Sequence, residues 1–416
     1  MVLHPNQRKA VETNSMYRLP TTSSIVSRKC VKVLPSNGTS FTENQQITIE
    51  LPAIGFLDNL NSCLSFDLSA GTTETLLTNN SQCYIDRLRV STGRNEVLVD
   101  IMEYGKLNGV LEAIFSHETY TDNVGSILEG TGTSTADTRS ITPTVTNTYA
   151  KTRRCIQLLG GILDNTTYFP LKYTNGLIID IFIASDAKTT CAGLTLSNVN
   201  YICEFLQMDA QYTANFEQQF LTSGIKYSFD TYQTSQTNIT TANFSKQIVE
   251  NVRSLKSVYA VQQYAADKDN VFRQARVKTI QWKYGADYIP SQAVNCENGG
   301  AEPLKELIKA VNLSGDNSYD INMTYTDWTD EESTGTGADT HGKKFIIGQN
   351  FELSPSQSMS GVDATKKPLQ VSMTYSADIA NTDAKQPAGD NAVTFTTFVH
   401  YDVIAVFSAQ GTQVIY

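Results

Sequence analysis

The sequence predicts an all-β protein made of two consecutive β-sandwiches with a few short helices. Apolar side chains recur at every second position in many short segments, the spacing that places them on one face of a strand. Thr, Ser and Asn are plentiful and only 18% of the residues are charged, a composition typical of short strands joined by polar turns. A chain of 416 residues is too long for one hydrophobic core, so two domains are expected.

Alternating segments occur in both halves of the chain. The clearest cover residues 47–51, 64–68, 177–183, 199–205, 225–229, 371–375 and 399–407. Each is expected to turn its apolar side chains toward a core. The residues Thr92-Gly93-Arg94-Asn95 separate two such segments and predict a hairpin turn, because Gly and Asn tolerate the backbone that a tight turn needs.

Three segments have helical spacing instead. Residues 102–115 and 302–312 each carry an apolar stripe, and Pro303 stands where the first turn of a helix tolerates proline. In residues 209–223, aromatic side chains recur at every fourth position: Tyr212, Phe216 and Phe220. In all three segments, a stripe that packs on a core is a better interpretation than a cofactor site.

The two halves repeat the same order of elements at an offset of about 190 residues. Each half has strands, a helix, a long polar loop and closing strands. This order predicts a duplicated sandwich whose halves have diverged. We therefore expect a flexible basic arm at 1–40, a first domain at 41–208, a helical linker at 209–223 and a second domain at 224–416.

Each half has about eight predicted strands, which is enough for a jelly roll, a sandwich of two packed sheets. The expected fold is thus two consecutive eight-stranded jelly rolls. The polar loops 116–151 and 313–342 exceed the usual length of a connection. If the halves are true duplicates, both loops emerge from the same end of their sandwich.

Charge is unevenly distributed along the chain. Residues 1–40 contain six basic residues and one acid, Glu12, a balance of +5. Because the whole chain has a net charge of −10, the remainder carries −15. A basic arm on an acidic body can contact a polyanion or anionic lipid, although a polar leader without a partner fits equally well.

The seven cysteines do not predict a disulfide framework. Their number is odd and no pair has CxxC spacing. Several lie in strand patterns, where a thiol behaves as a small buried hydrophobe. With no secretory signal pattern at the N-terminus, we expect a reducing compartment. The longest apolar stretch, 177–184, is interrupted by Asp180 and is too short to span a bilayer.

No constellation typical of an enzyme is present in the sequence. The four histidines, His4, His117, His341 and His400, show no metal-ligand spacing, and nucleotide-binding and nucleophile motifs are absent. His400 is out of step with the apolar face of its strand, which predicts an exposed or interface position. We expect no catalytic residues, no cofactor and no metal site.

One acidic loop contains the second tryptophan of the chain, Trp328. The neighbouring Asp327, Asp330, Glu331 and Glu332 offer oxygens to calcium but lack the spacing of a known loop, so a solvated charge run is the preferred interpretation. Trp328 is either an exposed contact residue or a side chain that pins the loop to the body.

Specific strings point to a known family. They are Gly55-Phe-Leu-Asp58 with Leu64-Ser-Phe-Asp67, Cys83-Tyr-Ile-Asp-Arg-Leu-Arg-Val90, Asp100-Ile-Met-Glu-Tyr-Gly-Lys-Leu107, Tyr168-Phe-Pro-Leu171 with Gly176-Leu-Ile-Ile-Asp-Ile181, and Ile280-Gln-Trp-Lys-Tyr284 running on to Tyr288-Ile-Pro290. In pattern and order, the chain resembles the double jelly-roll major capsid proteins of polinton-like viruses and virophages. The resemblance covers both halves, but the chain is short for that family.

The resemblance implies a capsid subunit. Three copies would form a pseudo-hexagonal homotrimer, and such trimers, with other capsomers and penton or minor capsid proteins, would tile an icosahedral shell around a DNA genome. The basic arm would face the genome or an internal membrane through Arg8, Lys9, Arg18, Arg28 and Lys29. The loops 116–151 and 313–342 would face outward, with Trp328, Asp327 and Asp330 as candidate contact residues. The expected location is the virion, assembled inside the host cell.

Three other functions compete with this interpretation. A non-viral module of two sandwiches would bind carbohydrate or a cell-surface ligand, but usually carries an export signal. A viral spike or minor capsid protein often has a single jelly roll or a fibrous repeat. An enzyme is the weakest alternative, because no acid–base or nucleophile set is apparent.

Overall fold

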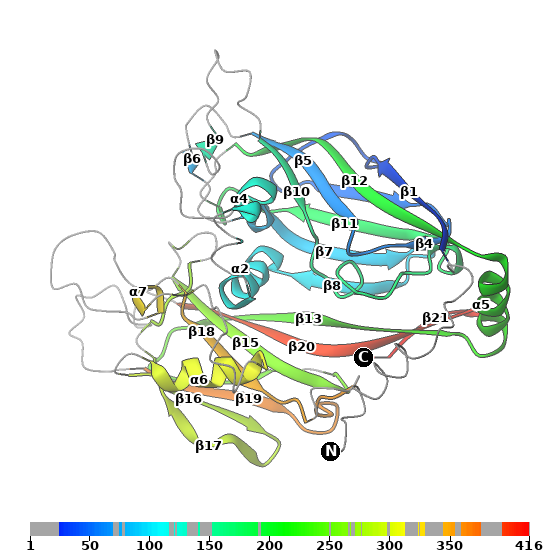
Figure 1. The fold of residues 1–416 in the computed structure, drawn as a ribbon. Helices are drawn as coiled ribbons and strands as arrows, with labels where there is room; N and C mark the ends of the chain where they lie inside the picture. Colours follow the sequence, from blue (N-terminus) through cyan, green and yellow to red (C-terminus); the bar gives the residue numbers. More distant parts are fainter. Residues whose placement is uncertain are drawn as a thin grey trace, which may run out of the picture.

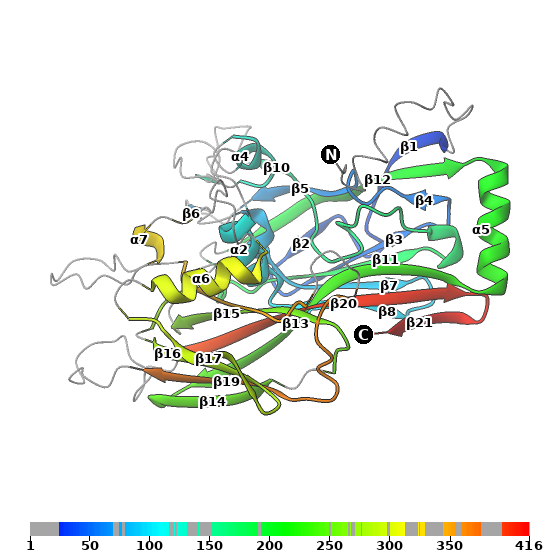
Figure 2. The ribbon, with the colours of Figure 1, turned by 60° about the horizontal axis from the view of Figure 1, so that its bottom comes forward.

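The computed structural model describes residues 25–69, 75–76, 80–115, 120, 123–130, 140–141, 152–189, 193–248, 251–264, 267, 271–275, 277–297, 300–312, 323, 325–328, 344–353, 359–375 and 393–415. These residues form two β-sandwiches that lie side by side (Figure 1). Helix α5 (Ala210–Thr222) spans both sandwiches at their common end, as Figure 2 shows.

The first sandwich consists of two antiparallel sheets. One contains, in spatial order, β1 (Ile25–Val33), β12 (Thr195–Met208), β5 (Cys63–Ser69) and β10 (Thr152–Ile156), with the short strands β2 (Ser40–Thr42) and β4 (Phe56–Leu57) paired to β12. The other contains β3 (Gln46–Leu51), β11 (Leu177–Ile183), β7 (Ile85–Thr92) and β8 (Val97–Met102). The short strands β6 (Thr75–Leu76) and β9 (Ser140–Ile141) pair with each other.

The second sandwich is built in the same way. One sheet contains β13 (Ile225–Ile239), β20 (Val393–Ser408), β15 (Leu255–Tyr264) and β18 (Ile346–Asn350), with β21 (Gly411–Ile415) paired to β20. The other contains β14 (Asn243–Ile248), β19 (Leu369–Tyr375), β16 (Val277–Tyr284) and β17 (Asp287–Asn295).

The two sandwiches have identical strand connectivity. If the eight main strands of each are numbered in chain order, one sheet reads 1-8-3-6 and the other 2-7-4-5 in both cases. In both, a helix follows the fifth strand: α2 (Tyr104–Phe115) in the first and α6 (Ala301–Ala310) in the second. The predicted order of elements and its repetition are therefore confirmed.

Period-two burial holds each sandwich together. In β11, the side chains of Leu177, Ile179 and Ile181 are completely buried. Asp180, which interrupts the apolar stretch, points the other way and accepts hydrogen bonds of 2.8 Å from both Gln46 Nε2 and Thr48 Oγ1. The carboxylate is thus satisfied on the outer face while its neighbours fill the core.

The predicted hairpin is also confirmed. β7 ends at Thr92 and β8 begins at Val97, and the Asn95 amide donates a hydrogen bond of 2.9 Å to the Thr92 carbonyl. Asn95 has a φ of 65°, in the left-handed region that Asn tolerates better than most residues. The turn chemistry read from the sequence therefore determines this connection.

All three predicted helices form, and two of them pack on the core. α2 buries Leu107, Val110 and Ile114 in the first sandwich, and α6 buries Leu307 in the second. The remaining short helices are η1 (Ser81–Tyr84), α4 (Val124–Leu128), η2 (Leu171–Tyr173) and α7 (Tyr325–Trp328). Within the described residues, no helix is both long and apolar enough to cross a membrane.

The third helix, α5, is exposed along most of its length. Its aromatic stripe does pack on the body: the Phe216 ring lies 5.1 Å from the Phe56 ring and 5.0 Å from the Tyr173 ring. Tyr212 contacts Phe56 as well but remains 38% exposed. α5 is therefore a surface helix fixed by a few ring contacts.

Because α5 buries little apolar surface, its N-cap should contribute measurably to stability. Asp209 Oδ1 accepts a hydrogen bond of 2.6 Å from the Tyr212 amide. We expect Asp209→Ala to lower stability by about 1 kcal/mol, since an orphan amide at the helix start loses its partner. Asp209→Asn should retain most of the stability, because Asn caps equally well. A thermal melt compares the variants; equal losses in both would show that the cap is not the cause.

The prediction of a flexible arm over 1–40 is wrong for its last part. Residues 25–33 form β1, which pairs with β12 from Ile25 opposite Met208 to Val33 opposite Tyr201. β1 is an edge strand and most of its residues are exposed. An edge strand exposed on both faces has no alternating burial, so the sequence pattern contained no signal for it.

Candidate functional site

The described residues contain no group of three or more His, Cys, Asp or Glu side chains placed to hold a metal ion. The features of interest are instead surfaces. One is the contact between the two sandwiches, which we call the seam; the others are the two ends of the molecule. The seam decides whether the halves behave as one rigid unit.

Polar side chains of the first sandwich bind β13 of the second. The Tyr227 hydroxyl donates a hydrogen bond of 2.8 Å to the Thr167 carbonyl and accepts one of 3.2 Å from Asn59 Nδ2. Asn165 Nδ2 donates to the Ser228 carbonyl at 2.9 Å. These bonds fix the segment 165–167 to the start of β13.

An aromatic cluster lies beside these hydrogen bonds. Phe169, from the first sandwich, is completely buried, and its ring lies 5.3 Å from Tyr227 and 5.6 Å from Phe407 in edge-on contacts. Aromatic pairs in this arrangement are favourable beyond their buried area. One continuous hydrophobic core therefore extends through both sandwiches.

A glycine allows a close approach between the halves. Gly161 is buried with a φ of +66°, and a Cβ at this position would lie 1.9 Å from the Asp230 carbonyl oxygen and 2.9 Å from the Phe229 ring. No other residue fits, because any side chain would overlap the backbone of β13. The first sandwich thus rests directly on the main chain of the second.

A network of charged and polar groups surrounds His400 on β20. His400 Nε2 lies 2.6 Å from Asp230 Oδ2 and Nδ1 lies 3.2 Å from Ser257 Oγ, while its ring stacks on Tyr232 at 4.7 Å. Burial opposes ionisation of Asp230, but the hydrogen bond and charge of His400, with the charge of Lys256, hold the pKa of Asp230 well below its usual range. The His400 side chain is only 13% exposed and these partners all belong to the second sandwich, so the prediction of an exposed position is wrong.

The pKa of Asp164, next to the seam, is shifted in the opposite direction to that of Asp230. Burial, together with the negative charge of Asp230, raises the pKa of Asp164 to about 6. Hydrogen bonds from the amides of Gly160 and Gly161 oppose this shift only in part. The pKa values of two carboxyl groups at the seam, those of Asp230 and Asp164, are thus shifted in opposite directions.

Comparison with known proteins identifies the architecture. No family model matches the sequence, and no curated protein matches it. A chain in the quasi-atomic model of the PBCV-1 virus capsid aligns with a TM-score of 0.63 at 9% identity, covering 97% of this chain and 100% of that one. The mavirus major capsid protein aligns with a TM-score of 0.55 at 10% identity, covering 100% and 96% of the two chains. This chain is a double jelly roll.

A third solved structure agrees with this assignment. A chain of the Sputnik virophage aligns with a TM-score of 0.54 at 13% identity, covering 100% of this chain and 92% of that one. The predicted fold and the predicted likeness to double jelly-roll capsid proteins of virophages are therefore confirmed.

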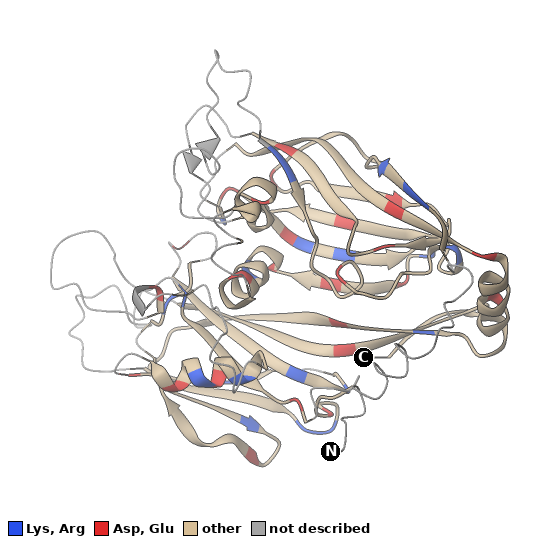
Figure 3. Cartoon of the chain, viewed as in Figure 1, with Lys and Arg blue, Asp and Glu red and all other residues tan. Residues whose placement is uncertain are grey.

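The predicted basic arm is only partly described. Arg8, Lys9 and Arg18 lie outside the described residues, whereas Arg28 and Lys29 belong to β1 of the double jelly roll, where Figure 3 shows basic residues. Arg28 forms an ion pair with Asp58 and approaches Glu204 at 3.9 Å. Arg28 therefore stabilises the first jelly roll instead of belonging to a free arm.

Of the three predicted outer contact residues, one is buried, one is partly exposed and one lies outside the described residues. Trp328 is only 4% exposed: its Nε1 donates a hydrogen bond of 3.1 Å to the Gly300 carbonyl and its ring packs at 4.8 Å from Phe345. The prediction that Trp328 is an exposed contact residue is therefore wrong. These contacts agree with the alternative prediction, that Trp328 pins the loop to the body. Asp327 lies 3.8 Å from Lys344 Nζ and is partly exposed. Asp330, like Glu331 and Glu332, lies outside the described residues.

Sequence reasoning missed the seam entirely. The pair Gly160-Gly161 was an available signal, since adjacent glycines mark a close approach or an unusual turn. Tyr227 was assigned only to an apolar strand face, and Asn59 and Asn165 gave no signal. Contacts between domains have no local period, so a pattern in one strand cannot show them.

Proposed function

We propose that this double jelly roll is a major capsid protein that forms pseudo-hexagonal homotrimers, and that the trimers tile an icosahedral shell around a DNA genome. It would act as a structural protein of the virion, assembled inside the host cell, with no catalytic role. The observation that carries the proposal is the identical strand connectivity of two sandwiches joined by a rigid seam.

The seam explains how one chain can serve a sixfold position. Because the two sandwiches have the same strand connectivity and lie side by side, three chains around an axis would place six similar units in a ring. A closed ring follows from repeating one heterologous contact. The solved structures that share this fold include major capsid proteins, which supports the same use here.

The two ends of the molecule differ in a way that fits a shell. The described helices of the two long loops, α4 and α7, lie at one end, and α5 lies at the other (Figures 1 and 2). We infer that the loops 116–151 and 313–342 form the outer surface, with Asp327 and Asp330 as contact candidates for receptors or other capsid proteins. Loops tolerate change and carry recognition, while the sheets keep the shell intact.

The end that carries α5 would then face inward. β1 begins there, because Ile25 pairs with Met208, the residue before the N-cap of α5. Residues 1–24 are continuous with β1, so Arg8, Lys9 and Arg18 would reach the genome or an internal membrane from this end, beside the exposed Lys29. Penton and minor capsid proteins would complete the shell.

Native mass spectrometry of the full chain tests the proposal. We expect a dominant species of three times the chain mass of 45.8 kDa, with hexagonal outlines in negative-stain images. An obligate contact should bury more than about 2,000 Å², so the trimer should survive dilution. A monomer that persists at high concentration, with or without calcium, would contradict the proposal and favour a two-domain binding module.

A further inference from the structure

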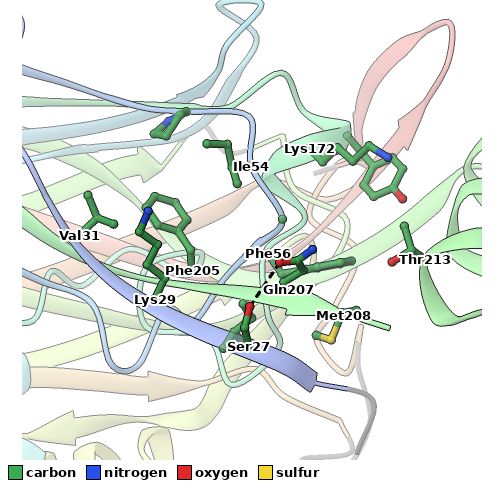
Figure 4. Close-up of a pocket in the computed structure, with 14 residues that line it drawn as sticks. Ser27, Lys29, Val31, Ile54, Phe56, Lys172, Phe205, Gln207, Met208 and Thr213 are labelled. Carbon is green, nitrogen blue, oxygen red and sulfur yellow. Dashed lines mark hydrogen bonds between the residues drawn. The ribbon is translucent and has the colours of Figure 1, made fainter. Parts of the chain in front are cut away.

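A pocket of about 490 Å³ lies near α5, on the first jelly roll (Figure 4). It is bounded by β1, the segment that leads into β4, η2, the end of β12 and α5. Apolar side chains line most of it: Val31, Ile54, Phe56, Phe205 and Met208. This volume falls within the range of about 300–1,000 Å³ that is usual for small-molecule sites.

Close packing beneath the pocket holds its lining residues in place. Gly55 has a φ of +58°, and a Cβ there would lie 2.4 Å from the Leu206 carbonyl oxygen, so only glycine lets this segment lie against β12. Phe56, Leu206 and Met208 form a small core of their own, against which Phe216 of α5 packs. The pocket is therefore preformed and does not depend on a ligand for its shape.

The charged groups at the pocket are both cations. Lys29 and Lys172 line it, from opposite sides in Figure 4, and none of the described residues that line it is a carboxylate. Lys172 is partly compensated, since its Nζ lies 3.8 Å from Glu217 and 5.4 Å from the Tyr173 ring centre. Lys29 has no ion pair among the described residues. An uncompensated lysine beside an apolar cavity is complementary to a ligand with an apolar body and one negative charge.

We propose that this pocket binds a single-chain anionic amphiphile, a long-chain fatty acid, with the hydrocarbon chain against Phe56 and Phe205 and the carboxylate at Lys29. The hydrocarbon chain supplies most of the affinity, because each methylene group that leaves water stabilises the complex. The lysine supplies selectivity for the acid over a neutral ester. This ligand is additional to the assembly function and does not depend on it.

Fluorescence titration of the full chain with cis-parinaric acid tests the proposal. We expect saturable binding of one molecule per chain, at least tenfold tighter than binding of the methyl ester, which keeps the chain but lacks the charge. Equal affinities for acid and ester would overturn the assignment of Lys29. Binding of anionic phospholipid vesicles without saturable binding of the free acid would overturn the pocket and indicate a membrane-facing surface.

Matched variants locate the site. Lys29→Glu should weaken binding of the acid at least tenfold. Lys32→Glu makes the same charge change on the same exposed strand but away from the pocket, and should change affinity less than twofold. Thr213→Trp, at the α5 side of the pocket, should fill it and abolish binding. Unchanged melting temperatures show that the variants fold. Equal effects of the two lysine variants would contradict the proposal.

Discussion

Gly161→Ala is expected to destabilise the protein by about 4 kcal/mol or more, because the added methyl group cannot be accommodated at the seam. Its Cβ would lie 1.9 Å from the Asp230 carbonyl oxygen, and the backbone of β13 cannot move away without breaking its pairing with β20. The positive φ adds a further cost of about 1–2 kcal/mol for a residue with a Cβ. Thermal unfolding measures the loss, and trimer formation should fail with it if the seam makes the two jelly rolls one unit.

Gly193→Ala is the matched control for this substitution. Gly193 also has a positive φ, of 68°, but it is exposed. We expect Gly193→Ala to lower the free energy of unfolding by about 1–2 kcal/mol, the cost of a positive φ for a residue with a Cβ. Similar losses in the two variants would show that the close approach of Gly161 to β13 contributes nothing and would remove the main argument for a rigid seam.

Glu129→Gln is expected to stabilise the protein in alkaline solution by about 3 kcal/mol and to have little effect at pH 4. Burial, with the negative charge of Glu112, raises the pKa of Glu129 to about 7 from an ordinary value of 4.5; hydrogen bonds from Tyr120 and Gln82 oppose the shift. Below pH 4.5 the carboxyl is protonated in both folded and unfolded chains. As the pH rises from 4.5 through 7, the unfolded chain ionises first, so stability falls. Each pKa unit corresponds to about 1.4 kcal/mol.

Melting temperatures measured between pH 4 and pH 8 check this prediction. The wild type should lose stability across the window and the glutamine variant should lose less. Glu50→Gln is the control, because Glu50 is exposed on β3. A constant difference between Glu129→Gln and the wild type at all pH values would contradict the assignment, since it would mean that the effect does not arise from ionisation.

Much of the fold was predictable because burial in a sandwich is periodic. β11 shows the reason: alternate residues from Leu177 to Ile183 are buried, and this period is visible in the sequence whatever the partner strand is. The helices α2 and α6 were predictable from the spacing of their apolar stripes, and the turn at Asn95 from its chemistry. The repeated order of these elements then predicted the duplication.

The candidate sites were much less predictable. Trp328 appeared to be a loop residue, but its burial depends on Gly300 and Phe345, which are distant in sequence. β1 was assigned to an arm, because the strand it pairs with among the described residues, β12, is about 170 residues away, and neither of its faces is buried enough to leave a pattern. The lining of the pocket at Lys29 comes from five separate segments, and no one of them contains a motif.

The sequence by itself determined most of the secondary structure, its repetition and the kind of sandwich, because these depend on local periods and on turn chemistry. The tertiary structure alone decided how the halves meet: Gly161 against the main chain of Asp230, Phe169 against Tyr227, and Asn165 against the carbonyl of Ser228. Such contacts join residues tens to hundreds of positions apart and require only that surfaces fit. Complementary shape and charge leave no period in the chain, so they become visible only when the chain is folded.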